Sequence, residues 1–322
     1  MLMLPMAAVF MFFIGSSVHW RTIALIGIVP CMPPLVAVIF ISESPRWLAK
    51  MGRAKECESA LEQLRGKNAD IFQEAADIKE CNKLLNQISD DGIMNLFQLK
   101  YAHIVIVGVG LMAMQQLGGL NGFSLYTSEI FDAAGFPSKL GFIVVSLGQL
   151  PLIFAGAYLI DKLGRLTLLM VSATGTFLGC FLTGLSFFFQ GLHWFEEYTP
   201  TLVLIGALAF LGSSSLGMGP IPWLIVSEIS PINVKGSLGS TCNFVNWFCS
   251  WFVAYTFNFL FQWSSAGTCF IYSIICCLSI IFTAKLVPET KGKSLEEIHA
   301  SQTQDNALIK IKFSPVALVT MH

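Results

Sequence analysis

The sequence predicts an all-α integral membrane protein with about eight transmembrane helices. Three observations carry this prediction: long apolar runs, a charged fraction of only 12%, and a one-sided distribution of Lys and Arg. Soluble domains carry about 25% charged residues, and the mean hydropathy of +0.68 also excludes an ordinary cytosolic protein. The net charge of -1 and the lack of a basic run interleaved with aromatics argue against nucleic acid as a partner.

The apolar runs define the spans, because a helix needs about 20 apolar residues to cross about 30 Å of hydrocarbon. The first run lacks the basic start and the small-residue cleavage site of a removable signal peptide, so we expect it to be retained. The predicted spans cover residues 1–18, 21–41, 101–127, 138–160, 166–189, 200–223, 236–261 and 266–287.

The basic residues orient these spans, since cytoplasmic loops are enriched in Lys and Arg. With both termini in the cytoplasm, 17 of the 19 fall on that side, and only Arg21 and Lys139 fall on the other. Changing the number of spans by one would scatter the charges over both faces. The sequence therefore predicts a multi-pass protein with an even number of spans.

A charged segment divides the chain. Residues 42–100 combine alternating charges with helix formers, and their apolar positions recur at helical spacing, which predicts a cytoplasmic helical loop. This leaves two spans in residues 1–41, a six-helix bundle in residues 101–287 and a cytoplasmic tail in residues 288–322. Six-helix bundles recur in transporters that are built from repeated halves.

Gly and Pro gather at two places in the bundle, at Gly118 and Gly119 and again between Gly217 and Pro222. These residues remove or distort helical hydrogen bonds, and a membrane tolerates the freed backbone groups only where protein or water satisfies them. The clusters thus indicate broken helices along a substrate path. Packing through small residues is the alternative for any single Gly.

Amide side chains accompany the first break, where Gln115 and Gln116 are followed by Asn121. Hydrocarbon cannot satisfy these donors and acceptors, whereas a sugar hydroxyl both donates and accepts hydrogen bonds. Neutral amides would bind a sugar without the desolvation cost of a charge. The alternative is that they join neighbouring helices to one another.

Signals for catalysis are weak. Gly108, Gly110 and Ala113 imitate part of a dinucleotide fingerprint, but no βαβ pattern surrounds them. His193, near Glu196, lacks a second His at metal-ligand spacing, and no nucleophile motif is present. We expect no enzyme activity, no cofactor and no metal site.

Five motifs resemble those of one family. QQLGGLN at 115–121 resembles the QQLSGIN signature of the sugar porter family within the major facilitator superfamily. The other four matches stand in the same order along the chain as in the family. These motifs are SESPRWL at 42–48, DKLGR at 161–165, GPIPW at 219–223 and PETKG at 288–292. Within the family, the chain looks most like the plant early-response-to-dehydration-type monosaccharide transporters.

The resemblance implies a major-facilitator-type helix bundle in which the eight spans correspond to helices five to twelve. It also implies transport of a monosaccharide, such as a hexose, by alternating access. An aromatic ring can stack on the C–H face of a pyranose, which suits the Trp of GPIPW. The family's sugar-contacting positions map onto Gln115, Gln116, Asn121, Gln149, Trp223 and Asn246.

A second implied constellation is charged and cytoplasmic. In the family such residues form an inner gate whose ion pairs hold when the cytoplasmic face is shut. Taken singly, each could be a solvated loop charge worth about 0–1 kcal/mol. The pairs predicted here are Glu43 with Arg46, Asp161 with Arg165, Glu228 with Lys235, and Glu289 with Lys291.

The resemblance covers about residues 19–298 and leaves the family's first four helices without a counterpart. Transport would then require self-assembly or a missing half supplied separately. A non-transporting protein with a residual sugar-binding half, and a membrane scaffold that acts through residues 42–100, are the alternatives. The sequence leaves open the sugar, proton symport against facilitated diffusion, and the plasma membrane against the vacuolar membrane.

Overall fold

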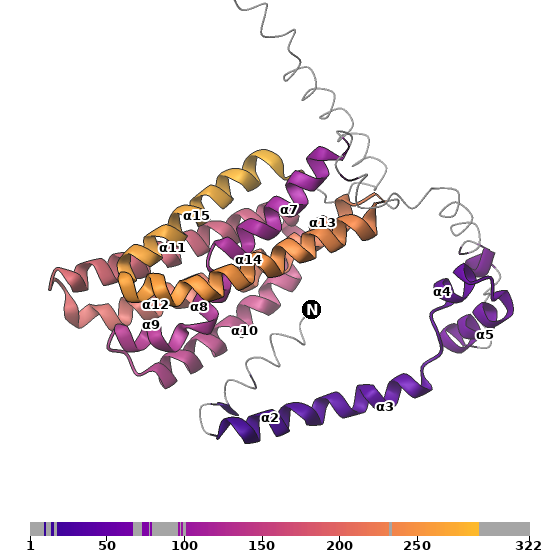
Figure 1. Cartoon of the computed structure of the whole chain (residues 1–322), viewed down its shortest axis with the longest axis horizontal. Helices are drawn as coiled ribbons and strands as arrows, with labels where there is room; N and C mark the ends of the chain where they lie inside the picture. Colours follow the sequence, from indigo (N-terminus) through magenta and orange to yellow (C-terminus); the bar gives the residue numbers. More distant parts are fainter. Residues whose placement is uncertain are drawn as a thin grey trace, which may run out of the picture.

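The computed structural model describes residues 18–66, 101–231 and 234–289, with short pieces at 10, 14–15, 73–76, 78, 96 and 98. Regular structure in these residues is helical (Figure 1), which confirms the predicted class. Within these described residues, seven stretches are long and apolar enough to cross a membrane. Most of the predicted span at 1–18, most of the loop after residue 66 and the tail after residue 289 lie outside the described residues.

The first described span, Trp20–Phe40, matches the predicted 21–41. It consists of α2 (Trp20–Ile28), a 3-10 turn (Val29–Cys31) and α3 (Met32–Phe40). None of its residues is buried, and it lies to one side of the remaining spans (Figure 1).

Two short helices follow it, α4 (Pro45–Lys50) and α5 (Ala54–Arg65). They pack together around a small apolar cluster that includes Leu48 and Cys57. Burial, assisted by the neighbouring Glu58 carboxylate, raises the pKa of the Cys57 thiol above its usual value. This small unit has its own apolar centre, separate from that of the bundle.

The remaining six spans form the bundle. In it α11 packs extensively against α12 and α15, and α7 packs against α14. The helices are α7 (Ala102–Leu117), α8 (Leu120–Leu125), α9 (Thr127–Ala133), α10 (Ser138–Leu163), α11 (Arg165–Gly191), α12 (Thr199–Ser213), α13 (Ile221–Ile229), α14 (Lys235–Trp263) and α15 (Ser265–Leu286).

Close approach of α11 and α12 depends on glycine. A Cβ atom at Gly179 would lie 2.4 Å from the backbone N of Phe210, and one at Gly206 would lie 2.4 Å from Thr183 Oγ1. Small residues at such crossings bring backbones into van der Waals contact, the main attraction between helices in lipid. Some glycines of the bundle are therefore needed for helix packing, which is the alternative that the sequence left open for any single Gly.

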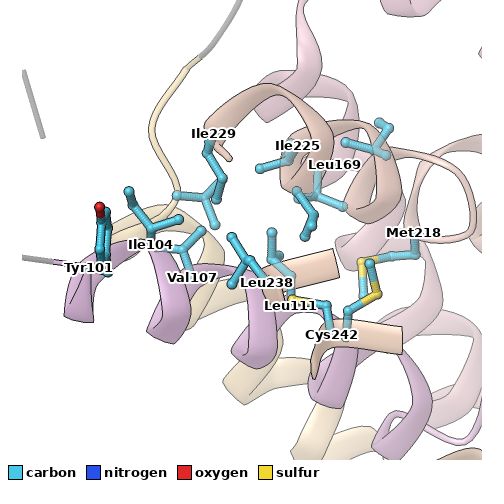
Figure 2. Close-up of a cluster of buried hydrophobic side chains, with 14 of the residues drawn as sticks. Tyr101, Ile104, Val107, Leu111, Leu169, Met218, Ile225, Ile229, Leu238 and Cys242 are labelled. Atoms are coloured by element: carbon cyan, nitrogen blue, oxygen red, sulfur yellow. The ribbon is translucent and has the colours of Figure 1, made fainter. Parts of the chain in front are cut away.

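Apolar packing in the bundle falls into two clusters. Figure 2 shows the first, where side chains from α7, α13 and α14 converge, among them Val107, Ile225 and Leu238. The second includes Phe123 and Phe257. Along α7, α11, α14 and α15 the chain passes from one cluster to the other, and the residues between them include polar side chains such as Gln115, Thr176 and Asn246. The structure thus places a polar layer between two apolar cores.

Candidate functional site

Buried polar side chains make up this layer. Gln115 is 5% exposed, Gln116 7% and Asn246 3%, which is unusual for amides in a membrane-spanning bundle. Each must find hydrogen-bond partners, because an unpaired buried amide costs several kcal/mol in hydrocarbon, roughly 2–7 by transfer data. The partners define the site.

The first helix break lies beside these amides. α7 ends at Leu117, and α8 begins after Gly119, whose φ is +91°. A Cβ atom at Gly119 would also lie 2.8 Å from the Tyr272 ring. Both the backbone conformation and the space therefore require glycine here, and the predicted interruption at Gly118 and Gly119 is confirmed.

The second break follows α12, where Ser214–Met218 forms a π-helical turn before α13 begins at Ile221. Ser172 of α11 stabilises this turn: its Oγ donates to Ser213 O and accepts from Met218 N at 2.7 Å. The predicted interruption between Gly217 and Pro222 is confirmed. Its π-helical form and its partner Ser172 were not foreseen.

Gln115 joins the two breaks. Its Nε2 donates to Met218 O and to Gly219 O, at 2.8 Å each. These are carbonyls released by the π turn and the prolines after it. Gln115, which the sequence predicts to face the substrate, therefore joins two helical segments, as the alternative interpretation of the sequence expects.

A chain of amides connects α7, α8 and α14. Gln116 Nε2 donates to Asn246 Oδ1 at 2.9 Å, and Asn121 Nδ2 donates to Gln116 Oε1 at 2.9 Å. Asn121 Nδ2 also donates to Ser250 Oγ. Sequence reasoning missed Ser250, although its position four residues after Asn246 places both on one face of α14.

The two other predicted positions stand apart from this chain. Gln149 is half-buried on α10, two residues before Pro151. Trp223 is half-buried on α13, one turn beyond the π turn, and packs in part against the first apolar cluster. The structure therefore brings Gln116, Asn121 and Asn246 together directly and links Gln115 to the break that precedes Trp223.

Charged residues gather at one end of the bundle. Arg165 Nη2 lies 3.1 Å from Glu228 Oε1, with both side chains about a quarter exposed. The Glu289 carboxylate accepts from the backbone N atoms of Arg165 and Leu166, at 3.2 and 3.1 Å, and so caps the N-terminus of α11. The described contacts therefore join different helices at this end.

The other predicted gate residues are less informative. Glu43 and Lys235 are exposed. The side chains of Arg46 and Asp161, and the whole of Lys291, lie outside the described part of the chain, so these pairings stay predictions. Among the described residues no group of three His, Cys, Asp or Glu side chains is placed to hold a metal ion.

Comparison with known families decides the identity. The family model "Sugar (and other) transporter" matches residues 4–301, which is most of the chain. The chain belongs to this family. Among the described residues, the motifs quoted above fall at the two helix breaks (115–121 and 219–223), at the charged end of the bundle (161–165 and Glu289) and at α4 (42–48).

Individual relatives support the assignment to this family. The chain is 50% identical over 300 residues to sugar transporter ERD6-like 16 of Arabidopsis thaliana, covering 93% of this chain and 62% of that protein. It is 48% identical to sugar transporter ERD6-like 7 of the same plant, over 90% of this chain and 62% of that protein. The chain thus spans about three-fifths of the length of these relatives.

Solved structures agree on the fold. The proton:xylose symporter XylE bound to 6-bromo-6-deoxy-D-glucose is similar with a TM-score of 0.71 and 26% identity, over 93% of this chain and 64% of that chain. The inward-open conformation of XylE from E. coli has a TM-score of 0.71 and 24% identity, over 92% of this chain and 63% of that one. The bundle is therefore of the major facilitator type.

Proposed function

We propose that this chain provides the sugar-binding half of a monosaccharide transporter that works by alternating access. The observation that carries the proposal is the chain of neutral amides between two broken helices. A hexose presents hydroxyls that both donate and accept, and amides can match both roles. The chain's membership of the "Sugar (and other) transporter" family and its similarity to XylE favour the same substrate class.

The amide chain suits a site that is emptied and refilled. Gln116, Asn121, Asn246 and Ser250 are hydrogen-bonded to one another, so these polar groups find partners within the protein itself. A sugar hydroxyl inserted among them would exchange these bonds for bonds of similar energy. Binding is then reversible enough for release on the other side of the membrane.

Trp223 and Gln149 complete the proposed site. The indole of Trp223 offers a rigid aromatic face for stacking on the sugar ring, together with one N–H donor. Trp223 lies just beyond the π turn, and π bulges commonly occur at functional sites. A rearrangement of this turn would reorient the indole ring. Gln149, on α10, supplies an amide from a fourth helix, in addition to α7, α8 and α14.

We propose that the charged end of the bundle is the inner gate. Arg165 and Glu228 join α11 to α13, and Glu289 joins the segment after α15 to α11. Breaking these bonds would free the ends of three helices at once, as a rocking motion requires. Glu43, Arg46, Asp161, Lys235 and Lys291 are the further proposed members of this gate.

Transport also needs a second wall, which we propose to be the other helical half or a second copy of this chain. The exposed side of α14 favours such a contact. It carries a row of large aromatic side chains around a shallow groove, and interface cores are enriched in Trp, Tyr and Phe. Its members include Phe244, Trp247, Phe248, Trp251 and Tyr255.

The proposed setting is the plasma membrane or the vacuolar membrane of a plant cell, with both termini in the cytoplasm. The excess of Lys and Arg in the loops assigned to that side supports this orientation. Protons are a proposed co-substrate because XylE, a structural neighbour, is a proton:xylose symporter. Facilitated diffusion is the other coupling mode compatible with the site.

The proposal can be tested with the purified chain in proteoliposomes. Binding and uptake of radiolabelled hexose would be measured for the wild type and for Gln115→Ala and Trp223→Ala. We expect each substitution to weaken binding about tenfold or more, because each removes contacts worth about 1.4 kcal/mol or above. Saturable uptake would establish that this polypeptide transports.

Two matched controls separate the site from general damage. Gln190→Ala removes a half-buried amide that donates to Ala133 O, and Trp263→Ala removes an exposed indole at the end of α14. Neither should change binding. Equal losses in all four variants would contradict the site assignment, and binding without uptake would show that this chain alone does not complete the transport cycle.

A further inference from the structure

A small cavity, partly open to its surroundings, lies among α7, α11, the π turn and α15 and is lined in part by Gln115. Five of the side chains that line it are polar: Gln115, Thr176, Ser214, Cys276 and Ser279. It is large enough for about one water molecule. A cavity with this lining is not explained by apolar packing.

Two of these side chains carry buried atoms without a hydrogen-bond partner, Gln115 Oε1 and Ser279 Oγ. Gln115 is 5% exposed and Ser279 is 1% exposed. The orientation of the Gln115 amide is determined by its contacts, because reversing it would set Oε1 against the carbonyls of Met218 and Gly219. Oε1 is therefore an acceptor in need of a donor.

The other hydroxyl groups of the cavity already donate hydrogen bonds to backbone carbonyls. Thr176 Oγ1 donates to Ala173 O, and Ser214 Oγ donates to Phe210 O. Both oxygens therefore present only lone pairs, and Ser279 is left with a proton to donate. The occupant must donate up to two hydrogen bonds and accept one. Water meets this requirement, whereas a cation would leave the Ser279 proton unpaired and place an uncompensated charge in the membrane.

We propose that this cavity is a binding site for a single water molecule that bridges Gln115 and Ser279, and that Ser279 thereby acts as a positioning residue for Gln115. The second part rests on the proposed sugar-binding function. With both amide protons on backbone carbonyls and one lone pair on the water, Gln115 keeps one acceptor position for a sugar hydroxyl. The water fixes the direction in which that position points.

The water itself is tested by synchrotron radiolytic labelling of the whole chain, in which hydroxyl radicals formed from bound water oxidise neighbouring side chains. Met218 and Met112 both belong to the first apolar cluster and are 7% and 0% exposed, but Met218 also lines the cavity whereas Met112 does not. We expect Met218 to be oxidised faster than Met112. Ser279→Val, which fills the cavity with methyl groups, should reduce the oxidation of Met218 to the level of Met112.

Positioning is tested by hexose binding to Ser279→Ala, which removes the hydroxyl without adding volume. We expect about a three- to tenfold loss of affinity, the value of one hydrogen bond. Ser279→Thr, which retains the hydroxyl, should bind more tightly than Ser279→Ala. Ser186→Ala is the control, because Ser186 is equally buried, donates to Leu182 O and lies outside the cavity.

The outcomes are distinct. Equal rates of oxidation of Met218 and Met112 in the wild type would overturn the water site. Loss of Met218 oxidation at saturating hexose would also overturn it, because a sugar hydroxyl would then be the partner of Gln115. Unchanged affinity in Ser279→Ala would overturn the positioning role. If the wild type binds no hexose, the proposed function fails, while the labelling experiment still decides the water site.

Discussion

The span Trp20–Phe40 and the six spans of the bundle are all apolar enough to cross a membrane, but they differ in packing. Trp20–Phe40 is the most apolar of the seven described spans and has 0% of its most apolar window buried. Ala102–Leu125 and Arg165–Gly191 are less apolar and have 50% buried. Hydropathy therefore indicates membrane insertion but not where helices contact one another.

The side chains that differ explain the packing. The buried face of α11 includes Gly179, Gly184, Ser172 and Thr176, whereas α3 is built from Met, Pro, Leu, Val, Ala, Ile and Phe. Lipid competes with apolar side chains for contact, so helices associate through close backbone approach and polar bonds instead. Packed and unpacked spans can therefore be distinguished by their small and polar residues.

The largest expected effect concerns the closest backbone approach. Gly179→Leu would force a side chain where even a Cβ atom would lie 2.4 Å from Phe210 N and 2.7 Å from Gly206 O. We expect a loss of about 3 kcal/mol or more, because the backbone must move apart and α12 cannot give way locally. The measurement is thermal unfolding in detergent, followed by a thiol-reactive dye that reports exposure of buried cysteines such as Cys180.

Gly239→Leu is the matched control, since nothing lies within 4 Å of a Cβ atom built at Gly239. It should leave the unfolding temperature unchanged. A similar loss in both variants would mean that the Leu side chain destabilises helices generally, and the argument from backbone contact would fail.

The next effect in size concerns the amide chain. Gln116→Leu leaves Asn246 Oδ1 and one proton of Asn121 without the partners they have now. We expect a loss of about 1–3 kcal/mol, the cost of buried groups left unsatisfied. The same unfolding assay measures it.

A double variant sharpens this prediction. Gln116→Leu combined with Asn246→Leu removes both partners of one bond, so the second substitution should cost less in this background than alone. Additive losses would show that the two amides do not act as a pair. The Trp20–Phe40 span has no equivalent position, because its polar side chains are exposed at its start.

Much of the fold and part of the candidate site could be predicted from the sequence, but the difference in packing could not. The spans, the two breaks and the amides followed from hydropathy, from Gly and Pro, and from the cost of burying polar groups. The partners could not be predicted. Ser172 and Ser213 are far apart in sequence, and a buried Ser that bonds a carbonyl on another helix looks the same in the sequence as one that bonds its own.

The charged end shows the same limit. The predicted partner of Arg165 was Asp161, and that pairing stays a prediction because the Asp161 side chain lies outside the described part of the chain. The structure adds a contact of Arg165 with Glu228 on a different helix, and a helix cap in which Glu289 accepts from backbone N–H groups. Charge counts predict which end of the bundle is charged, but the crossing of helices determines the partners.

A smaller effect is expected for this helix cap. Glu289→Ala removes the acceptor for two N–H groups at the start of α11 and should cost about 1 kcal/mol. Glu289→Gln retains an acceptor without the charge and should recover part of that loss. If both variants unfold at the wild-type temperature, the cap adds nothing to the packing of α11, and the bundle's stability comes from its interior alone.

The smallest effect is expected in the unpacked span. Ala37→Leu adds apolar volume to an exposed position of α3, where every described neighbour on the helix is also exposed. The change in unfolding free energy of the bundle should stay within about 0.5 kcal/mol, because surface substitutions rarely exceed that. The unfolding assay used for Gly179→Leu measures both ends of the scale. A loss above about 1 kcal/mol would exceed that range and mean that Trp20–Phe40 packs against a partner in the assembled protein. The contrast would then lie between two packed regions with different partners, since the high hydropathy of this span is equally compatible with lipid and with a protein surface.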